Sequence, residues 1–581
     1  MAASLPSDGR KELSSAKDAL KPLMWRAGTF SFFVNLLMLT GPIYMLQIYD
    51  RVLSSRSVET LVVITILTFG LFAAMALLDF ARGALLARAG GRFEDSLKTA
   101  TFNLSADAAR RGASGADQPI KDLRQIRQFV SSPALTAVFD APWTPVFLLV
   151  VFLMHWLLGL VAVAGLLILL SLAIINERAS RSATAEAHAA TVEADRLALS
   201  AFRNAAAADA MGMRRPLRER WLKKGGAASS QNVLATDTIG GLTAASKATR
   251  LFLQSAILGV GALLAIGGQV TPGVMIAASI ITGRALAPVE IVTSQWRNFA
   301  LTRLSYKRLA KFLASAPAEA EKTALPAPRG AIKVERLYCQ PGTAKRPVLK
   351  NISFEVEAGE AIGVVGPSAA GKSTLARALV GVEAPRAGEI RLDGALLTQW
   401  ERDALGAHIG FLPQDIELFA GTAAENISRF ASDPAADQII AAAKAAGAHD
   451  MILSFTDGYD TEIGERGAHI SAGQRQRLGL ARALYGDPAI VVLDEPNANL
   501  DGEGDAALAQ AVKGLKARGA TTIVVAHRPS AIAFVDKLLL LIDGEVRAFG
   551  PRDEILKQIA PSQVASFRKP EPRKEDASGA A

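Results

Sequence analysis

Residues 366–373 are Gly-Pro-Ser-Ala-Ala-Gly-Lys-Ser, and they fit the phosphate-loop pattern G-x-x-x-x-G-K-[ST] at every position. The glycines let backbone N–H groups turn toward phosphate oxygens, and a following helix adds partial positive charge at its N-terminus. We expect Lys372 to reach the β- and γ-phosphates of a nucleotide and Ser373 to hold Mg²⁺ through its hydroxyl. The residues assigned to the nucleotide here are Gly366, Pro367, Ser368, Ala369, Ala370, Gly371, Lys372, Ser373 and Thr374.

The flanks of this loop favour the nucleotide interpretation over a glycine-rich turn with a chance Lys-Ser. Residues 361–365 form an apolar run that predicts a buried strand, and residues 374–380 predict the start of a helix. A phosphate loop requires this order of strand, loop and helix.

A second stretch, residues 490–495, predicts a buried strand that ends in two carboxylates, Asp494 and Glu495. Asp494 suits Mg²⁺ coordination, mostly through water. Glu495 is placed to orient or deprotonate an attacking water. Two acids after a strand are often only surface residues, but the phosphate loop in the same chain favours the catalytic interpretation.

Residues 471–484 predict a helix that begins with Ser471 and Gly473. A Ser and a Gly at a helix N-terminus make a second potential anion site. Two anion sites in one domain suggest that one of them serves the nucleotide of a neighbouring copy.

The composition indicates a membrane protein. The chain has 581 residues, enough for several domains, half of them hydrophobic, and its formal net charge is +9. A basic balance alone would suit nucleic acid, but the long apolar runs favour a membrane and positive cytoplasmic loops, so we expect no nucleic-acid partner. Cys339 is the single cysteine, which fits a reducing cytoplasm. Residues 1–26 are polar and predict no signal peptide.

Six membrane spans are predicted. Four stretches lack charged residues: 27–49, 60–78, 141–176 and 251–283. Each of the first two is long enough to cross a bilayer once, which takes about 20 residues. The last two are too long for one span, so we divide them near residues 155–159 and at the turn cluster 267–273. The alternative, buried helices of a large soluble protein, would require several such stretches by accident.

The connections between the spans set the orientation. Residues 82–133 contain nine Lys and Arg, and residues 177–250 contain twelve, whereas the other connections are short and only Arg51 and Arg56 stand out. The basic side is expected to be cytoplasmic. Both termini are therefore cytoplasmic, as an even number of spans requires.

The two long basic connections are rich in Ala and Leu and predict helices that continue beyond the bilayer, with a short helix at each loop tip. Residues 211–216 interrupt this pattern, and residues 296–313 predict a basic helix after the last span. The fold class is a membrane α-helical domain of six transmembrane helices plus an α/β phosphate-loop domain. The predicted parts are residues 1–26, a cytoplasmic segment; 27–315, the membrane domain; 316–329, a linker; 330–558, the nucleotide-binding domain; and 559–581, a disordered tail.

The nucleotide-binding part resembles the ATP-binding cassette (ABC) family. Residues 471–474, Ser-Ala-Gly-Gln, are similar to its signature motif LSGGQ, with Ile470 in place of Leu and Ala472 in place of the first Gly. The methyl group of Ala472 stands where backbone approaches phosphate. We expect it to alter affinity or turnover without abolishing either.

Further positions resemble the family in the expected order. Gln414 resembles the loop glutamine that touches Mg²⁺ and water, and residues 464–467 resemble the segment that contacts the coupling helices of exporters. His527, after the predicted strand 521–525, resembles the switch histidine on the γ-phosphate, although a lone histidine can also be a solvated loop residue. The resemblance implies these roles: catalytic, Glu495, His527 and Gln414; nucleotide-binding, Ser471, Gly473, Gln474 and Asp501, the last at the dimer interface; Mg²⁺-binding, Ser373, Gln414 and Asp494.

The residue that stacks on adenine is left open. Tyr338 is the nearest aromatic, but the family usually places a Tyr about where Pro341 stands. Tyr338 is therefore either the stacking residue or an ordinary strand residue.

The resemblance also implies a homodimer, because ABC proteins pair the phosphate loop of one copy with the signature of another, and this chain contains one of each. The expected cofactors are ATP and Mg²⁺. ATP closes the dimer, the loop tips pass the movement to the spans, and hydrolysis resets the dimer without a covalent intermediate.

Five segments resemble type I protein-secretion exporters of the PrtD type, which export proteases, lipases and surface-layer proteins: residues 48–61, 126–135, 140–145, 283–288 and 494–501. This resemblance covers about residues 22 to 556. It implies a multi-pass protein of the bacterial inner membrane, a periplasmic membrane-fusion adaptor, an outer-membrane channel protein and a secreted polypeptide substrate. No peptidase-like domain is expected before the spans, so we expect no leader cleavage. The resemblance implies a substrate with an uncleaved C-terminal signal.

Two alternatives stay open. A lipid or small-amphiphile exporter on the same fold would not depend on an adaptor. An ATP-gated channel or regulatory membrane ATPase would usually have lost a catalytic residue, and both Glu495 and His527 are present. Polar groups in the spans are candidates for substrate contact: Asn35, Gln47 and Arg284, the last of which also suits the membrane boundary.

Overall fold

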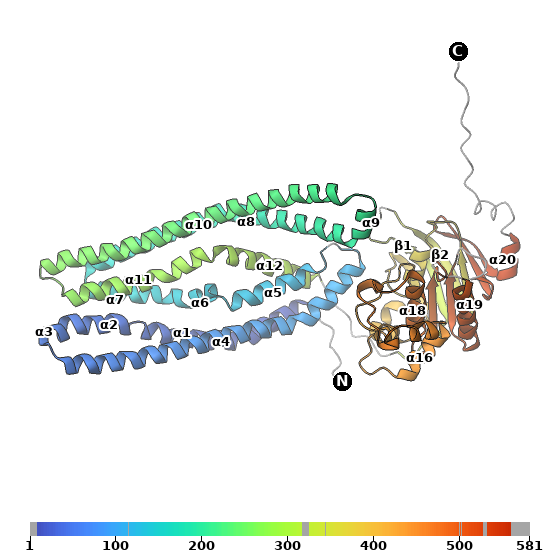
Figure 1. Cartoon of the computed structure of the whole chain (residues 1–581), viewed down its shortest axis with the longest axis horizontal. Helices are drawn as coiled ribbons and strands as arrows, with labels where there is room; N and C mark the ends of the chain where they lie inside the picture. The colour runs from blue at the N-terminus through green and yellow to red at the C-terminus, as the bar shows by residue number, and fades with distance from the viewer. Residues whose placement is uncertain are drawn as a thin grey trace, which may run out of the picture. The chain divides into compact units, whose positions relative to one another are not determined.

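The computed structural model describes residues 9–113, 115–315, 325–342, 344, 346–498, 500, 502–526 and 532–558. The chain divides into two compact units (Figure 1). The first contains residues 1–107 and 115–319, and its described elements are all helices. The second contains residues 108–114 and 320–581 and holds all the described strands. Most of the predicted linker and the whole predicted tail lie outside the described residues.

The helical unit is built from long helices joined by tight turns. Its elements are α1 (Gly9–Leu37), α2 (Thr40–Gln47), a π-helical turn η1 (Ile48–Val52), α3 (Leu53–Ser55), α4 (Val58–Arg110), α5 (Gln118–Val130), α6 (Pro133–Asp140), a 3₁₀ turn η2 (Ala141–Trp143), α7 (Thr144–Met154), α8 (Trp156–Arg203), α9 (Ala205–Ala210), α10 (Arg214–Ile266), α11 (Pro272–Ser294) and α12 (Trp296–Ala314).

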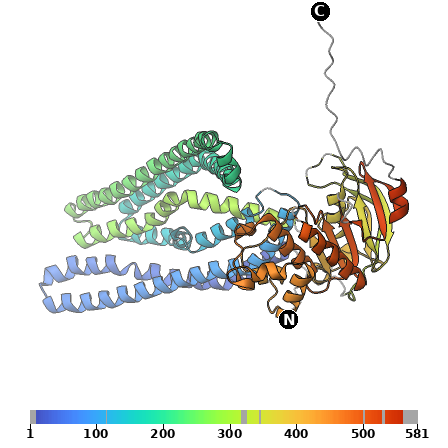
Figure 2. The same cartoon turned by 45° about the vertical axis from the view of Figure 1, so that its right-hand side comes forward.

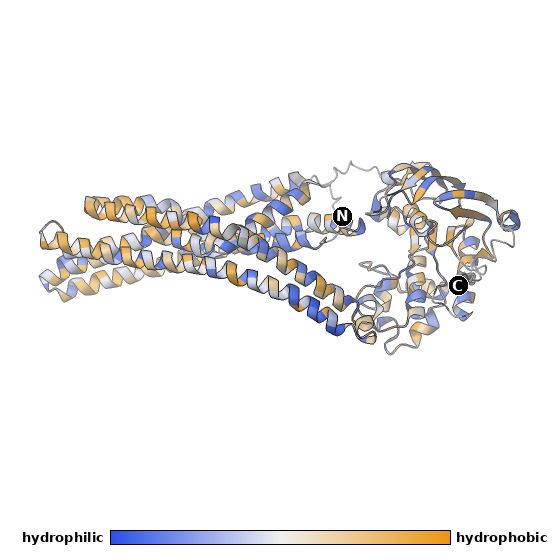
Figure 3. Cartoon of the chain, turned by 90° about the horizontal axis from the view of Figure 1, so that it is seen from above, coloured by the Kyte–Doolittle hydropathy of each residue, from blue (hydrophilic) through white to orange (hydrophobic). Residues whose placement is uncertain are grey.

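Six segments of this unit are long and apolar enough to cross a membrane, which confirms the predicted number. They are Lys11–Ser55, Val58–Arg110, Pro133–Met154, Trp156–Arg203, Arg214–Ile266 and Pro272–Ser294. Hydrophobic residues gather toward one end of the helical unit, and hydrophilic residues become more frequent toward the other (Figure 3). The apolar end is therefore the part that fits a bilayer.

The breaks between paired spans lie where turn residues predicted them. His155 is extended, and its Nδ1 accepts a hydrogen bond from the backbone N–H of Leu157 at 3.2 Å, so it caps α8. Thr271 caps α11 in the same way by accepting from the N–H of Val274, and Pro272 begins the helix. Both turns are thus determined by local chemistry.

The first predicted crossing, residues 27–49, lies within one apolar segment, Lys11–Ser55, and is confirmed. The helix is broken inside it, because α1 ends at Leu37 and α2 begins at Thr40. Pro42 explains the break, because it has no N–H to donate and its ring crowds the carbonyl of Met38.

The predicted helical extensions are confirmed, but only one of the two predicted loop-tip helices is present. α9 is the short helix at the tip of the second loop. At the first tip, the described residues between Arg110 and Gln118 form turns, so the prediction of a short helix there is wrong. Gly112 and Gly115 have φ angles of 73° and 77°, a left-handed conformation that ends a helix.

Three apolar clusters lie in the described part of the helical unit, the smallest of them around Leu169, Leu253 and Leu286. The two larger ones join most of its helices. One joins α7, α8, α10 and α11, with Phe147, Val151 and Ile257 at its centre. The other joins α1, α4, α5 and α12 through residues such as Phe93 and Leu97. In both cartoon views α8 runs beside α10, and α4 runs beside α1 and α2 (Figures 1 and 2).

The second unit contains two sheets. Its strands are β1 (Ile332–Cys339), β2 (Leu349–Val356), β3 (Ala361–Val365), β4 (Ala387–Leu392), β5 (Ala395–Leu396), β6 (Ile409–Leu412), β7 (Ile490–Asp494), β8 (Thr521–Val525), β9 (Lys537–Ile542) and β10 (Glu545–Pro551). Its helices are α13 (Lys372–Leu379), α14 (Arg402–Ala407), α15 (Ala423–Ile427), α16 (Ala436–Ala445), α17 (His449–Leu453), α18 (Ala472–Leu484), α19 (Gly502–Ala517) and α20 (Arg552–Gln558), with 3₁₀ turns η3 (Leu397–Gln399), η4 (Gly458–Asp460) and η5 (Glu465–Gly467).

The larger sheet has the order β10-β9-β3-β8-β7-β6, and the smaller antiparallel sheet has the order β2-β1-β4-β5. β9, β3, β8, β7 and β6 are parallel, whereas β10 pairs antiparallel with β9. Every residue of β7 is buried: Val491 and Leu493 face one apolar cluster, and Ile490 and Val492 face the other. A core on both faces is what a parallel sheet requires, and the predicted strands at 361–365, 490–494 and 521–525 are confirmed.

A buried ion pair outside the apolar end gives a test of the packing of the helical unit. Asp122 in α5 is 2% exposed and accepts two hydrogen bonds from Arg308 in α12, at 2.9 and 2.6 Å. We expect Arg308→Ala to lower the free energy of unfolding by about 3 kcal/mol, because it leaves a buried carboxylate without its charge partner. Thermal unfolding of the purified protein measures this.

Lys98→Ala is the matched control, because Lys98 bonds Asp95 in an exposed pair whose loss costs little. Equal unfolding temperatures for the Arg308 and Lys98 variants would contradict the expectation.

Candidate nucleotide-binding site

The chemically suggestive residues lie at one edge of the larger sheet. β3, β8, β7 and β6 are successive parallel neighbours, so their carboxyl ends meet at the same edge. The loop 366–373 follows β3, Asp494 ends β7, and Gln414 comes two residues after β6. Open parallel sheets bind ligands at this edge.

The conformation of the loop depends on its two glycines. Gly366 has φ 156°, and a Cβ there would lie 2.0 Å from the carbonyl oxygen of Leu541. Gly371 has φ 99°, and a Cβ there would lie 2.8 Å from a methyl group of Leu349. Any side chain at either position would displace the loop or its neighbour. Glycine at both ends therefore fixes the turn that precedes α13.

Lys372 lies over the loop that it follows. Its Nζ donates to the carbonyl oxygens of Gly366 and Pro367, each at 3.0 Å, and the residue is only 5% exposed. Burial lowers the pKa of Lys372 below its usual value, and the carboxylates of Glu495 and Asp494 oppose that shift. An ammonium group held in this way is ready to exchange loop carbonyls for phosphate oxygens.

Ser373 and Asp494 bring two oxygen ligands together. The Ser373 hydroxyl donates to Oδ1 of Asp494 at 3.2 Å, and Asp494 is 2% exposed. Burial raises the pKa of the Asp494 carboxyl, while the hydrogen bond from Ser373 lowers it. A hydroxyl and a carboxylate are the ligands that Mg²⁺ accepts beside phosphate oxygens, so these residues fit the ion.

Glu495 is held in an unusual conformation beside Gln414. Its φ is 51°, in the left-handed region, and its N–H donates to the carbonyl of Val525 in β8 at 2.9 Å. Its Oε2 accepts a hydrogen bond from Nε2 of Gln414 at 3.2 Å. Left-handed non-glycine residues are costly and concentrate at functional sites. The structure thus brings together Lys372, Ser373, Asp494, Glu495 and Gln414.

Ser471 and Gln474 form hydrogen bonds with one another, each from its backbone N–H to the other's side chain. The Gln474 N–H donates to the Ser471 hydroxyl at 3.2 Å, and the Ser471 N–H donates to the Gln474 side chain at 2.8 Å. This reciprocal cap begins α18, with Ala472 as its first residue and Gly473 as its second. In the described chain these residues cap their own helix and make no contact with the phosphate loop.

The remaining predicted residues divide into two groups. Tyr338 is a half-buried residue of β1 that pairs with Ala387 of β4, so the structure places it in a strand. Asp501 and His527 lie outside the described residues.

Gln476 was missed at the sequence level. It is 1% exposed, and its Nε2 donates to the carbonyl of Pro496 at 2.7 Å. This bond ties the helix that begins at Ser471 to the turn that follows Glu495. The signal in the sequence was a polar residue on the buried face of a predicted helix, two positions after Gln474.

Comparisons with known proteins agree with this geometry. The family description "ABC transporter" matches residues 349–498, and "ABC transporter transmembrane region" matches residues 24–284. The type I secretion system ATP-binding protein PrsD of Rhizobium meliloti is 44% identical over 540 residues, which cover 92% of this chain and 93% of that protein. The leukotoxin translocation ATP-binding protein LktB of Mannheimia haemolytica is 29% identical and covers 91% of this chain and 75% of its own.

A solved structure of a bacterial Atm1-family ABC exporter with ATP bound has the same fold, with a TM-score of 0.81. It is 22% identical and the match covers 94% of this chain and 98% of that one, so it is evidence for the fold alone. Because of the two family matches and the long match to PrsD, the chain belongs to the ABC transporters as an ATP-binding protein of type I secretion systems, in which ATP hydrolysis drives protein export.

Proposed function

We propose that this chain moves unfolded polypeptides with an uncleaved C-terminal signal across the bacterial inner membrane, as a homodimer with ATP and Mg²⁺. The observation that supports this most is the 44% identity to a type I secretion protein over nearly the whole chain. The polar cluster at the sheet edge, with its lysine, hydroxyl and carboxylates, provides the chemistry.

In this proposal, Lys372 and the N–H groups of residues 368–374 neutralise and orient the phosphates of ATP. Ser373 and Asp494, with Gln414 nearby, would hold Mg²⁺, which neutralises charge on the β- and γ-phosphates. Glu495 would accept a proton from the attacking water, and its bond with Gln414 would keep the carboxylate in place. His527 and Asp501 complete the proposed set.

Ser471 and Gln474 cap the N-terminus of α18, and a helix N-terminus can bind an anion. We infer that this site does not bind the nucleotide of its own copy. We assign it, with Gly473, to the nucleotide of a partner copy. A periplasmic membrane-fusion adaptor and an outer-membrane channel protein would continue the route. The basic connections favour cytoplasmic termini and a cytoplasmic nucleotide-binding domain.

A pull-down tests this function directly. The Glu495→Gln variant, crosslinked in its host cells and purified with ATP, is expected to retain bound nucleotide, an adaptor and a secreted polypeptide with an intact C-terminus. Mass spectrometry of the recovered proteins is the measurement. Recovery of lipid alone, with no adaptor under any nucleotide condition, would refute protein export and support a lipid or amphiphile exporter.

Glu495→Gln should also lower steady-state ATPase activity by about a hundredfold or more, because general-base catalysis contributes about 10²–10⁴. ATP binding should persist, since the amide keeps the shape of the carboxylate. Phosphate release and nucleotide retention by the purified protein measure the two effects. Glu417→Gln, at an exposed position of the same unit, is the control and should hydrolyse ATP normally; activity above a tenth of wild type in the Glu495 variant would argue against its assigned role.

Ala472→Gly tests the departure in the signature. Ala472 is the first residue of α18, and its methyl group limits how closely a phosphate approaches the helix. We expect the KM for ATP to fall by about 2- to 5-fold, a change on the scale of one weak contact. Ala436→Gly, at the start of α16, controls for the loss of helix propensity, which costs about 0.5–1 kcal/mol. An unchanged KM in Ala472→Gly would mean that the methyl group does not face phosphate.

A further inference from the structure

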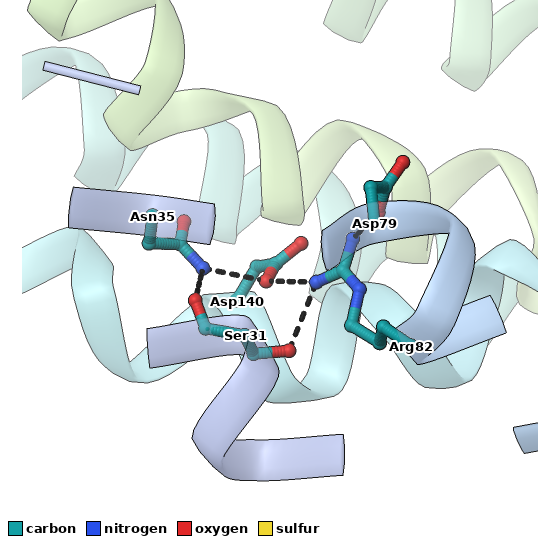
Figure 4. Close-up of polar contacts among 5 residues, drawn as sticks. All are labelled: Ser31, Asn35, Asp79, Arg82 and Asp140. Atoms are coloured by element: carbon teal, nitrogen blue, oxygen red, sulfur yellow. Dashed lines mark hydrogen bonds and ion pairs between the residues drawn. The ribbon is translucent and has the colours of Figure 1, made fainter. Parts of the chain in front are cut away.

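A buried polar network joins three helices of the membrane unit (Figure 4). Arg82 of α4 donates through Nη1 to Oδ1 of Asp140, at 2.8 Å, and to the hydroxyl of Ser31 in α1, at 2.9 Å. Asn35 of α1 donates to the same Asp140 oxygen at 2.7 Å. The other terminal nitrogen of Arg82, Nη2, bonds Asp79 on its own helix at 2.5 Å. We call Ser31, Asn35, Arg82 and Asp140 the Arg82 network.

The network lies where the apolar stretches end. Asp79 and Arg82 directly follow the uncharged run 60–78 of α4, and Asp140 precedes the uncharged run 141–176. The Arg82 side chain is 6% exposed and that of Asp140 is 16% exposed. Charges at membrane depth are expensive and are usually kept for function. Apolar residues usually stabilise a fixed contact between helices at least as much as a buried ion pair does. Stability of packing alone therefore does not explain the Arg82–Asp140 pair.

The Arg82 network is also the first anchor of α4. Between Val58 and Ala81 the helix has no buried residue, and Arg82 is the first one. The next buried side chain, Leu86, lies one turn further on. Arg82 therefore provides the first buried attachment of α4 to the rest of its unit; nearer the start of the helix, Thr65 also bonds Tyr44 of α2 in an exposed contact, at 2.8 Å.

The bonds of the network are arranged so that both Arg82 and Asp140 keep a hydrogen-bond partner if α4 separates. If α4 moved away from α1 and α6, Arg82 would keep Asp79, which is 57% exposed and travels on the same helix. Asp140 would keep the amide of Asn35, which lies on the other side of the parting. Removing one partner of a buried pair usually leaves an uncompensated charge at high cost. This arrangement reduces that cost, because Arg82 keeps a carboxylate and Asp140 keeps a hydrogen bond, although not a charged partner.

We propose that the Arg82 network is a releasable lock that holds α4 against α1 and α6, and that it opens and re-forms in each ATP-driven transport cycle. Arg82 and Asp140 are then positioning residues for export: they touch neither nucleotide nor, at 5% exposure for Arg82, the polypeptide. This inference rests on the proposed export function. Asn35, predicted as a substrate contact, is 2% exposed and belongs to the lock instead.

The first test separates locking from packing by replacing the pair with apolar residues. Arg82→Met and Asp140→Leu are made singly and together. The single variants should unfold at lower temperature, whereas the double variant should recover to within about 3 °C of wild type because no charge is left unpaired. Export per ATP hydrolysed should stay reduced about tenfold or more in the double variant, on the scale of allosteric coupling free energies.

Export is measured as the polypeptides that disappear from the culture medium of the host when the chain is deleted, and ATPase activity is measured on the purified full chain. Lys98→Met with Asp95→Leu, an exposed pair on the same helix, is the matched control. Wild-type export per ATP in the Arg82/Asp140 double variant would overturn the lock. If deletion of the chain does not change the polypeptides in the medium, that result counts against the export function. It does not count against the lock, which the second test decides.

The second test detects opening and does not depend on export. Ser31 is 1% exposed, so a cysteine placed there by Ser31→Cys should be protected from a water-soluble maleimide while the lock is closed. Burial raises the pKa of the native Cys339 to about 11, which keeps its reactive thiolate scarce, and Cys339→Ala removes the remaining background.

Labelling rates are compared without nucleotide and with ATP held by the Glu495→Gln variant. The rate at Ser31→Cys should differ by about tenfold between the two states. Ala16→Cys, at a buried position of the same helix, should be protected in both. Equal rates at Ser31→Cys, or a parallel change at Ala16→Cys, would overturn the proposal.

Discussion

The nucleotide site depends on the parallel packing of β3, β8, β7 and β6. Because these strands point the same way, their carboxyl ends deliver the phosphate loop, Asp494 and Gln414 to a single edge. The 3.2 Å contact between Ser373 and Asp494 exists only because β3 and β7 flank β8 in register. A sheet buried on both faces has little freedom to shift. Small functional side chains therefore keep their relative positions although they come from distant parts of the sequence.

Features with a local cause were predictable from the sequence. The phosphate loop needs Gly366 and Gly371 for its left-handed or otherwise crowded backbone, and both positions are visible in a motif. The number of spans follows from uncharged length, and the turns at His155 and Thr271 follow from capping chemistry. In each case the residues that determine the structure lie within a few positions of one another.

Features that depend on tertiary partners were not predictable. Asn35 looked like a free polar group in a span, but its partner Asp140 is 105 residues away. Gln47 is half-buried and Arg284 is exposed, so the three polar candidates of the spans have different environments. The bond of Gln476 to Pro496 likewise joins α18 to a distant turn, and the left-handed Glu495 bonds the carbonyl of Val525 on the neighbouring strand. The spacing of residues in a single sequence does not show which distant side chains will be in contact.

Two buried ion pairs in the helical unit show how partner placement separates fixed from releasable contacts. Arg308 bonds both oxygens of Asp122, and parting α5 from α12 would leave Arg308 with the Ser305 hydroxyl of its own helix, 3.2 Å away, but without a carboxylate. Arg82 instead divides its two terminal nitrogens between neighbouring helices and its own Asp79. An arginine fork suits such a division, because its donors are fixed in one plane and serve two directions at once. The free energy needed to part a helix thus depends on which charged groups keep a charged partner after its bonds break, as well as on how many bonds break.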